Sequence, residues 1–587
     1  MNVRESSSLL FVRKWKNKII PCAASAVQGI CIKSRHITYH NDKIYNFLGG
    51  TRMPVTAFYN GVIYTADAES PVAEAFAIEN GKFVFVGKAS ELPECEERID
   101  LGGKCVIPGL IDSHCHMIAG ITQSAANMIF IDPKTRPEHL SEAISTQLRH
   151  HHIPETETIT IMGIDLTIGE FSAANIDPAV SDRPVIIFSN DGHALLLNSK
   201  AMEELGICKE TPDPDSNSYY VRNENGEPTG LVIEIAAMLP CKALIREIAP
   251  EENEEIIREL VLSYSRLGYT GIFEAMSADD DSTDVLEILQ KMDKAGRIPL
   301  HISTSFCYHG EDIMNAETVL GLMKRNREMY SSENVNHDTL KMITDGTVEE
   351  QTALLYEPYA DSEDNYGSEM LSAEEMKNAA RLAADEGFSV HIHAIGDKAV
   401  TRALDVLCEL KGCEGTRTIA HNQLYTDDDT ARIINDGGIF FQTTPQWMKN
   451  DDYTLSYLGE QRFAKQFQAG TMQRGGVTVT FGSDSCLEPE TANAFVGMFY
   501  ASARGDSAAC GKECLPPQSE SISRMESLMA YTVNAAKQLK LDYKTGSISV
   551  GKLADFAVID RDVINCPVQE LKKIKVEQTW FCGNRVI

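Results

Sequence analysis

The chain has 587 residues, which exceeds the usual size of a single domain and is long enough to bury a large core. Its composition, with 43% hydrophobic and 24% charged residues, is that of a soluble globular protein. The formal charge of -31 argues against nucleic acid and anionic membranes as partners, because both are polyanions. No apolar run approaches the roughly 18–20 residues that a membrane-spanning helix needs.

Residues 1–52 differ from the rest in charge, with nine basic residues against two acidic ones. A basic, acid-poor leader is typical of an organellar transit peptide. The alternative, which we favour, is that this leader is not part of the mature protein, because a domain-like pattern begins only at Met53.

The fifteen cysteines show no CxxC pair and no regular spacing. This usage is typical of reduced thiols rather than of a disulfide framework. We therefore expect a cytoplasmic protein with free thiols.

Both ends of the domain-like region, residues 53–105 and 535–587, contain short β-rich runs separated by glycine turns. The runs cover residues 57–65, 75–78, 82–87, 556–560 and 576–587. Neither end alone is long enough to form a stable sheet. The sequence therefore predicts one small β-sandwich domain built from both chain ends.

Residues 106–534 alternate between strand-like and helix-like segments. Apolar β-rich runs recur at 106–113, 271–275, 299–306, 339–344, 388–393, 418–421, 438–444 and 477–483, and residues 373–387 show the spacing of an amphipathic helix. Strand–helix alternation predicts a parallel sheet, and eight strands predict a closed (β/α)8 TIM barrel of the α/β class. The gap at about 120–265 is too long for one crossover and predicts an insertion.

Residues with metal-binding side chains stand where these strands end, which is where barrel enzymes carry their active sites. His114 and His116 end the first strand two residues apart, so both side chains point to the same face. Lys341 lies on the fourth strand, and later strand ends carry His391, His393, His421 and Asp484. Any one of these residues alone would more often have a structural role than a metal-binding role. Their joint placement in one barrel predicts a metal site.

These motifs give the chain a resemblance to the amidohydrolase superfamily, specifically to its family-three branch, which includes N-substituted formamide deformylase. The matching segments, over about residues 55–587, are PGLIDSHCHM, LKMITDGTVEEQTALLYEPY, HIHAIGDKAV, IAHNQL, FGSDS and the tail AYTVNAAK…GSISVGKLADFAVID. The segment DRPVIIFSNDGHALLLNSKAM, with NGEPTGLVIE after it, resembles the insertion of this branch.

The resemblance implies a divalent metal site, with zinc as the metal and two ions. His114 and His116 would hold the first ion together with Asp484, while His393 and His421 would hold the second. Lys341 would bridge the ions after its carboxylation by CO2. The family pattern places the fifth-strand ligand at His393 rather than at His391, and Cys115 points to the opposite face.

This ligand set predicts hydrolysis of a C–N bond in an amide, formamide or cyclic amide. Histidine and carboxylate ligands with an open position suit catalytic zinc, which lowers the pKa of bound water towards 7 so that hydroxide can attack a carbonyl carbon. Asp484 would act as general base and then general acid. His193 and Asn198 of the insertion would face the substrate; a loop histidine and a helix cap are their alternative roles.

Two other functions stay open. One is deamination of a nitrogen heterocycle at a mononuclear site with unmodified Lys341, and the other is a catalytically silent scaffold or signalling protein. We expect a small-molecule substrate, whose identity the sequence leaves open. The sequence is compatible with a homo-oligomer.

Overall fold

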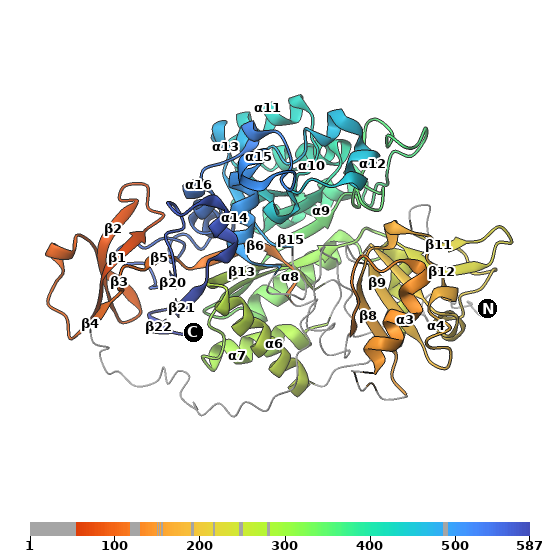
Figure 1. Ribbon diagram of the computed structural model, residues 1–587, viewed down its shortest axis with the longest axis horizontal. Helices are drawn as coiled ribbons and strands as arrows, with labels where there is room; N and C mark the ends of the chain where they lie inside the picture. The colour runs from red at the N-terminus through yellow and green to blue at the C-terminus, as the bar shows by residue number, and fades with distance from the viewer. Residues whose placement is uncertain are drawn as a thin grey trace, which may run out of the picture.

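The computed structural model describes residues 55–117, 129–149, 151, 153, 156–189, 193–214, 218–245, 250–278, 282–484 and 491–587. The expected leader, residues 1–52, lies outside this part of the chain. The described residues form three sheets: a barrel in the middle, a sheet made from both chain ends on one side, and the sheet of the insertion on the other (Figure 1).

The central sheet has eight parallel strands and confirms the predicted barrel. In barrel order they are β6 (Leu110–Cys115), β13 (Tyr269–Ala278), β14 (His301–Tyr308), β15 (Val335–Ile343), β16 (Ser389–Ala394), β17 (Arg417–His421), β18 (Ile439–Thr443) and β19 (Val479–Phe481). The ring closes between its last and first strands, where the backbone N–H of Asp484 donates to the carbonyl of His114 at 2.8 Å.

Helices surround this barrel, as strand–helix alternation requires. They are α6 (Pro250–Arg266), α7 (Asp284–Lys294), α8 (Ala316–Tyr330), α9 (Ala373–Asp385), α10 (Asp397–Glu409), α11 (Asp427–Asp436), α12 (Asp452–Phe463), α13 (Ala469–Arg474), α14 (Ala494–Ala503), α15 (Ser507–Cys510), α16 (Arg524–Ala530) and α17 (Val533–Gln538). The predicted helix at 373–387 is α9, which begins with a capping box between Ser372 and Glu375. Its buried face consists of alanines and Met376.

The apolar run expected as one strand at 106–113 is two strands in the structure. β5 (Cys105–Pro108) pairs with β20 (Phe556–Ile559) in the end sheet, whereas β6 belongs to the barrel. The chain crosses from one sheet to the other at Gly109, where a Cβ would lie 2.0 Å from Oγ1 of Thr270. Only glycine permits this approach, and an unbroken apolar pattern hides the change of sheet.

The end sheet joins segments from both ends of the chain, in the order β22–β21–β20–β5–β1–β2–β3 with β4 paired to β1. Its other strands are β1 (Thr56–Tyr64), β2 (Val72–Glu79), β3 (Lys82–Gly87), β4 (Glu97–Asp100), β21 (Val576–Phe581) and β22 (Asn584–Arg585). Phe83 of β3 and Phe556 of β20 have ring centroids 6.2 Å apart although three strands separate them in the sheet. The sheet therefore curls around an aromatic core that includes Phe58, Phe76 and Trp580.

The insertion forms a six-stranded sheet with its own hydrophobic clusters. Its strands are β7 (Ile129–Phe130), β8 (Ile159–Ile164), β9 (Val185–Ser189), β10 (Ala194–Leu197), β11 (Tyr219–Arg222) and β12 (Pro228–Ile233), with helices α3 (Pro137–Leu148), α4 (Ser199–Leu205) and α5 (Ile235–Met238). The stretch expected as insertion, 120–265, also contains most of α6. This helix contacts α7 and β13 and is therefore an outer helix of the barrel.

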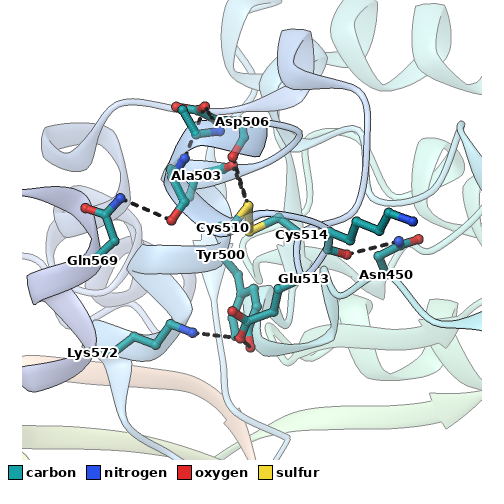
Figure 2. Close-up of a disulfide and its surroundings, with 12 residues drawn as sticks. Asn450, Tyr500, Ala503, Asp506, Cys510, Glu513, Cys514, Gln569 and Lys572 are labelled. Atoms are coloured by element: carbon teal, nitrogen blue, oxygen red, sulfur yellow. Dashed lines mark hydrogen bonds and ion pairs between the residues drawn. A yellow bond between two sulfur atoms is a disulfide. The ribbon is translucent and has the colours of Figure 1, made fainter.

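One expectation about the cysteines is wrong. Cys510 and Cys514 form a disulfide in the loop that follows α14, shown in Figure 2. Ten other cysteines among the described residues are free. The spacing of four residues gave no signal, because the pair meets only when the turn after α15 folds back. Asn450 fastens this loop: its side-chain N–H donates to the carbonyl of Lys512 at 3.0 Å, and its backbone N–H donates to the carbonyl of Glu513 at 2.9 Å.

Within the described part of the chain, no helix is both long and apolar enough to cross a bilayer.

Candidate metal centre

Three predicted ligands meet where the barrel closes. The ring Nε2 atoms of His114 and His116 lie 3.5 Å and 3.0 Å from Oδ1 of Asp484. One ligand atom from each residue falls within 4.8 Å of the other two, and all three side chains are buried. Asp484 has φ +53°, a left-handed conformation that non-glycine residues adopt at a cost and that is frequent at functional sites.

The seam between the first and last barrel strands holds this trio together. A Cβ on Gly482 would lie 2.6 Å from the backbone nitrogen of His114, so only glycine allows the two strand ends to approach this closely. Asp112 joins the seam from beneath, since its carboxylate accepts hydrogen bonds from the N–H and the hydroxyl of Ser483 at 2.9 Å and 2.5 Å. Asp112 thereby fixes the residue next to Asp484.

The remaining predicted ligands lie around the same opening. Lys341 Nζ is 3.5 Å from Nε2 of His114. The rings of His393 and His421 have centroids 4.4 Å apart, and Nδ1 of His421 lies 3.7 Å from Oδ2 of Asp484. His421 also has a left-handed backbone, with φ +70°. The structure thus brings all six sequence-predicted ligands to one end of the barrel.

His391 lies behind the trio rather than among it. Its Nε2 is 3.0 Å from Nδ1 of His114, the ring atom that faces away from Asp484. Its ring also packs against Phe273, with centroids 4.8 Å apart. His391 is therefore placed to orient the ring of His114, the supporting role that ligating histidines usually require.

Asp345 supports the loop that follows His393. Its fully buried carboxylate accepts backbone N–H groups from Leu354, Ile395 and Gly396 at 2.8–3.0 Å, and Oδ1 lies 3.6 Å from Nε2 of His393. Burial raises the pKa of Asp345 to about 7, and the three N–H groups act against that rise. Asp345 ties together the chain segments that follow β15 and β16.

The buried histidines of the site are held in the form that binds metals. Burial lowers the pKa of His114, His391, His393 and His421 well below the usual value, and the nearby positive charge of Lys341 adds to the effect. Neutral imidazole is the ligand form of histidine, so the cluster is ready to coordinate without first losing protons.

A pocket opens directly over these residues and holds about 350 Å³ of empty space. The site supplies one side of its wall, and the rest of the lining is Met276, Ile343, Thr347, Ile395, Trp447 and His193. Trp447 stacks on His421 with an interplanar angle of 14° and centroids 5.4 Å apart. The pocket therefore offers a largely apolar surface facing the candidate ligands.

The two residues predicted to face the substrate differ in position. His193 lines the pocket, and its ring centroid is 6.3 Å from that of His393. Asn198 is buried within the insertion, where its side chain bonds the backbone of Val185 and Arg183 and caps α4 through Ala201. Asn198 thus takes its alternative role as a helix cap, because every polar atom of its amide is used by the backbone.

The donor set fits a divalent cation by its chemistry. Histidine nitrogens and a carboxylate are ligands that zinc prefers. Oδ1 of Asp484 and Nδ1 of His421 are buried and make no hydrogen bond among the described residues, and such orphaned polar atoms are costly unless a ligand satisfies them. A buried ammonium on Lys341 beside these histidines would repel a cation, whereas a carboxylated lysine would attract it.

Sequence reasoning missed three supporting residues: Asp112, Asp345 and Glu234. Glu234, at the end of β12, places Oε2 at 3.0 Å from Nδ1 of His193. Asp112 stands two residues before His114 in the strand-end motif, so its position was a usable signal. Glu234 gave no signal in the sequence, because only the folding of the insertion brings it to the barrel.

A parallel eight-stranded barrel with histidines, a lysine and an aspartate at the ends of its strands defines the class of metal-site α/β-barrel proteins. The family model described as "Amidohydrolase family" matches residues 97–587. The chain therefore belongs to the amidohydrolase family, which confirms the resemblance seen in the sequence.

Similar proteins carry different names. The chain is 29% identical over 442 residues to the exoenzymes regulatory protein AepA of Pectobacterium carotovorum, covering 72% of this chain and 93% of that protein. It is 25% identical over 562 residues to an N-substituted formamide deformylase of Arthrobacter pascens, covering 91% and 98%. A solved metal-dependent hydrolase from Pyrococcus horikoshii shares the fold with a TM-score of 0.67 at 22% identity, covering 88% of this chain and 99% of that one.

Proposed function

We propose that the protein is a metal-dependent hydrolase of a carbon–nitrogen bond in a small amide, formamide or cyclic amide. The observation that carries the proposal is the convergence of donor atoms from His114, His116 and Asp484 within 4.8 Å at the mouth of a barrel. Membership of the amidohydrolase family and the similarity to a formamide deformylase support the same reaction class.

In this proposal His114, His116 and Asp484 would hold one zinc ion, His393 and His421 would hold a second, and a carboxylated Lys341 would supply oxygen ligands to the site. Bound divalent cations supply Lewis acidity, which makes water acidic near pH 7 and polarises a carbonyl oxygen. The chain supports this assignment through a cluster of buried, neutral imidazoles and the orphaned Oδ1 of Asp484.

Asp484 is the residue proposed to move protons. One of its oxygens faces His114 and His116, while the other lies nearer His421. The carboxylate therefore stands at the centre of the site, where it can take a proton from the attacking water and return it to the leaving nitrogen. Met276, Ile343 and Trp447 line the same pocket and would present apolar surface to the bound substrate.

Elemental analysis combined with a screen of N-acyl, N-formyl and cyclic amide compounds tests the proposal. We expect about two metal ions per chain and hydrolysis of at least one compound class. Asp484→Asn should retain most of the metal and lose several orders of magnitude in turnover, because the amide cannot take a proton. Turnover close to that of the wild type in this variant would overturn the role of Asp484.

Other outcomes of the same experiment separate the alternatives. One metal ion per chain, an unmodified Lys341 and release of ammonia from a nitrogen heterocycle would favour a mononuclear deaminase. Metal removal with no change in any activity would favour a scaffold or signalling role, a reading to which the regulatory name of one relative gives weight.

A further inference from the structure

Glu234 of the insertion lies where the insertion meets the end of the barrel strands, between His193 and Gly346. It follows β12, its side chain is fully buried, and its Oε2 lies 3.0 Å from Nδ1 of His193. Its backbone N–H donates to the carbonyl of His193 at 2.8 Å, so two contacts join the same two residues. Neighbouring Gly346, beyond β15, leaves room for the carboxylate: a Cβ there would lie 2.7 Å from Oε1.

The backbone at Glu234 is held in an unusual conformation, with φ +65° and ψ 159°. A residue with a side chain adopts this region only at a cost in free energy, and such strain clusters at functional sites. The carboxylate is held between His193 of the insertion and Gly346 beyond β15. The strain aims the carboxylate at His193.

The pair supplies a hydrogen-bonding group at a fixed place in the pocket. With Nδ1 of His193 engaged by Glu234, Nε2 stands on the opposite side of the imidazole ring, and the ring lines the pocket beside His393. A buried carboxylate is costly unless a positive group neutralises it. An imidazole with a proton on both ring nitrogens can donate from Nδ1–H to this carboxylate and from Nε2–H into the pocket.

We propose that Glu234 is a positioning residue which holds His193 so that its Nε2–H donates to the carbonyl oxygen of the bond to be cleaved. This inference rests on the proposed hydrolysis and goes beyond it, because it makes the insertion a part of the catalytic site. The donor lines the same pocket as the candidate metal ligands and would stabilise the negative charge that develops on the carbonyl oxygen during attack.

A double-mutant cycle on the full-length, metal-loaded protein tests the pair. The variants are Glu234→Gln, His193→Gln and the double variant, assayed on the best amide from the screen. Loss of one preorganised donor costs about 10²–10³-fold in kcat. We expect Glu234→Gln to lose about 10²-fold in kcat with KM within about threefold of the wild type. The double variant should lose no more than His193→Gln, because Glu234 acts through His193.

A second buried pair in the same chain provides the control. His301 and Asp555 also make a buried contact, Nε2 to Oδ2 at 3.0 Å, but outside the pocket. His301→Gln should lower the unfolding midpoint without changing kcat. For Glu234→Gln, metal content equal to that of the wild type shows that the loss of kcat is not a loss of the site.

Three outcomes would overturn the inference. One is wild-type kcat in Glu234→Gln, another is multiplication of the two single losses in the double variant, and the third is loss of metal in proportion to loss of activity. If the metal-loaded wild type hydrolyses no compound, the proposed function fails and the role of the pair falls with it. If the wild type is active and the Glu234 and His193 variants are equally active, only the proposed role of the pair is refuted and the proposed function stands.

Discussion

Asp345 gives the sharpest test of how the barrel keeps the site in shape. Its two oxygens accept three backbone N–H groups, two at Oδ2 and one at Oδ1. In Asp345→Asn one oxygen becomes an amide N–H2, so at least one buried backbone N–H loses its acceptor. A hydrogen bond to a charged group contributes about 1.5–3 kcal/mol, and an orphaned buried N–H costs about 1–3 kcal/mol. We expect a loss of about 2–4 kcal/mol in stability.

The same substitution should weaken metal binding. Asp345 joins the segments after β15 and β16, and its Oδ1 lies 3.6 Å from Nε2 of His393, so loosening those segments moves a candidate ligand. Loss of a supporting residue of this kind typically costs 10–100-fold in metal affinity. The midpoint of urea unfolding and a competition titration with a chelator measure the two effects.

Asp293 offers a matched control for Asp345. It is also buried and accepts three hydrogen bonds, from the hydroxyl of Ser332 and from the backbone and side-chain N–H groups of Asn334 at 2.6–2.9 Å. These bonds lie just before β15 begins, at the end of the barrel opposite the site. Asp293→Asn should lose similar stability and keep its metal. An unchanged urea midpoint in Asp345→Asn, or equal metal loss in both variants, would refute the reasoning.

Three further predictions follow from single contacts. His391→Ala should lower metal affinity by about 10–100-fold without abolishing binding, because Nδ1 of His114 loses its 3.0 Å partner; a chelator titration decides this. Trp447→Ala should weaken the metal or substrate affinity by about 3–10-fold through loss of its stacking on His421, whereas Trp447→Phe should retain much of it; unchanged constants in Trp447→Ala would contradict the stacking role. Burial lowers the pKa of His337 to about 4, against about 6.5 in the unfolded chain, so its contribution is complete above pH 6.5 and is lost as the pH falls towards 4. The free energy of unfolding should therefore drop by up to about 3 kcal/mol over that pH range. In His337→Gln the urea-unfolding midpoint should depend less on pH between 6.5 and 4. An equal pH dependence in the wild type and in His337→Gln would contradict this role of His337.

The strand ends could be read from the sequence because their signal is local. Two histidines separated by one residue after an apolar run must share a face, and the structure puts His114 and His116 on one side of Asp484. Barrel order could be inferred as well, since eight apolar runs alternate with helices. The change of sheet at Gly109 could not, because both halves of that run are buried and carry the same apolar residues.

Contacts between distant segments escaped the sequence for a different reason. Glu234 and His193 stand 41 residues apart, and nothing in either segment records their meeting. The amide of Asn198 suits a substrate-binding residue and a helix cap equally well. Only its hydrogen bonds to backbone groups in the folded protein identify it as a cap. Cys510 and Cys514 likewise gave no signal in a chain with fifteen cysteines.

The candidate ligands and several residues of the pocket wall come from different parts of the chain. The proposed ligands stand on barrel strands or shortly after them, where the pairing of eight neighbouring strands limits their movement. His193 and Glu234 belong to the insertion between the first two strands, and Trp447 belongs to the loop after β18. Loops tolerate substitution better than a barrel core does. Substitutions in the insertion can therefore change which compound fits the pocket while the six candidate ligands stay in place.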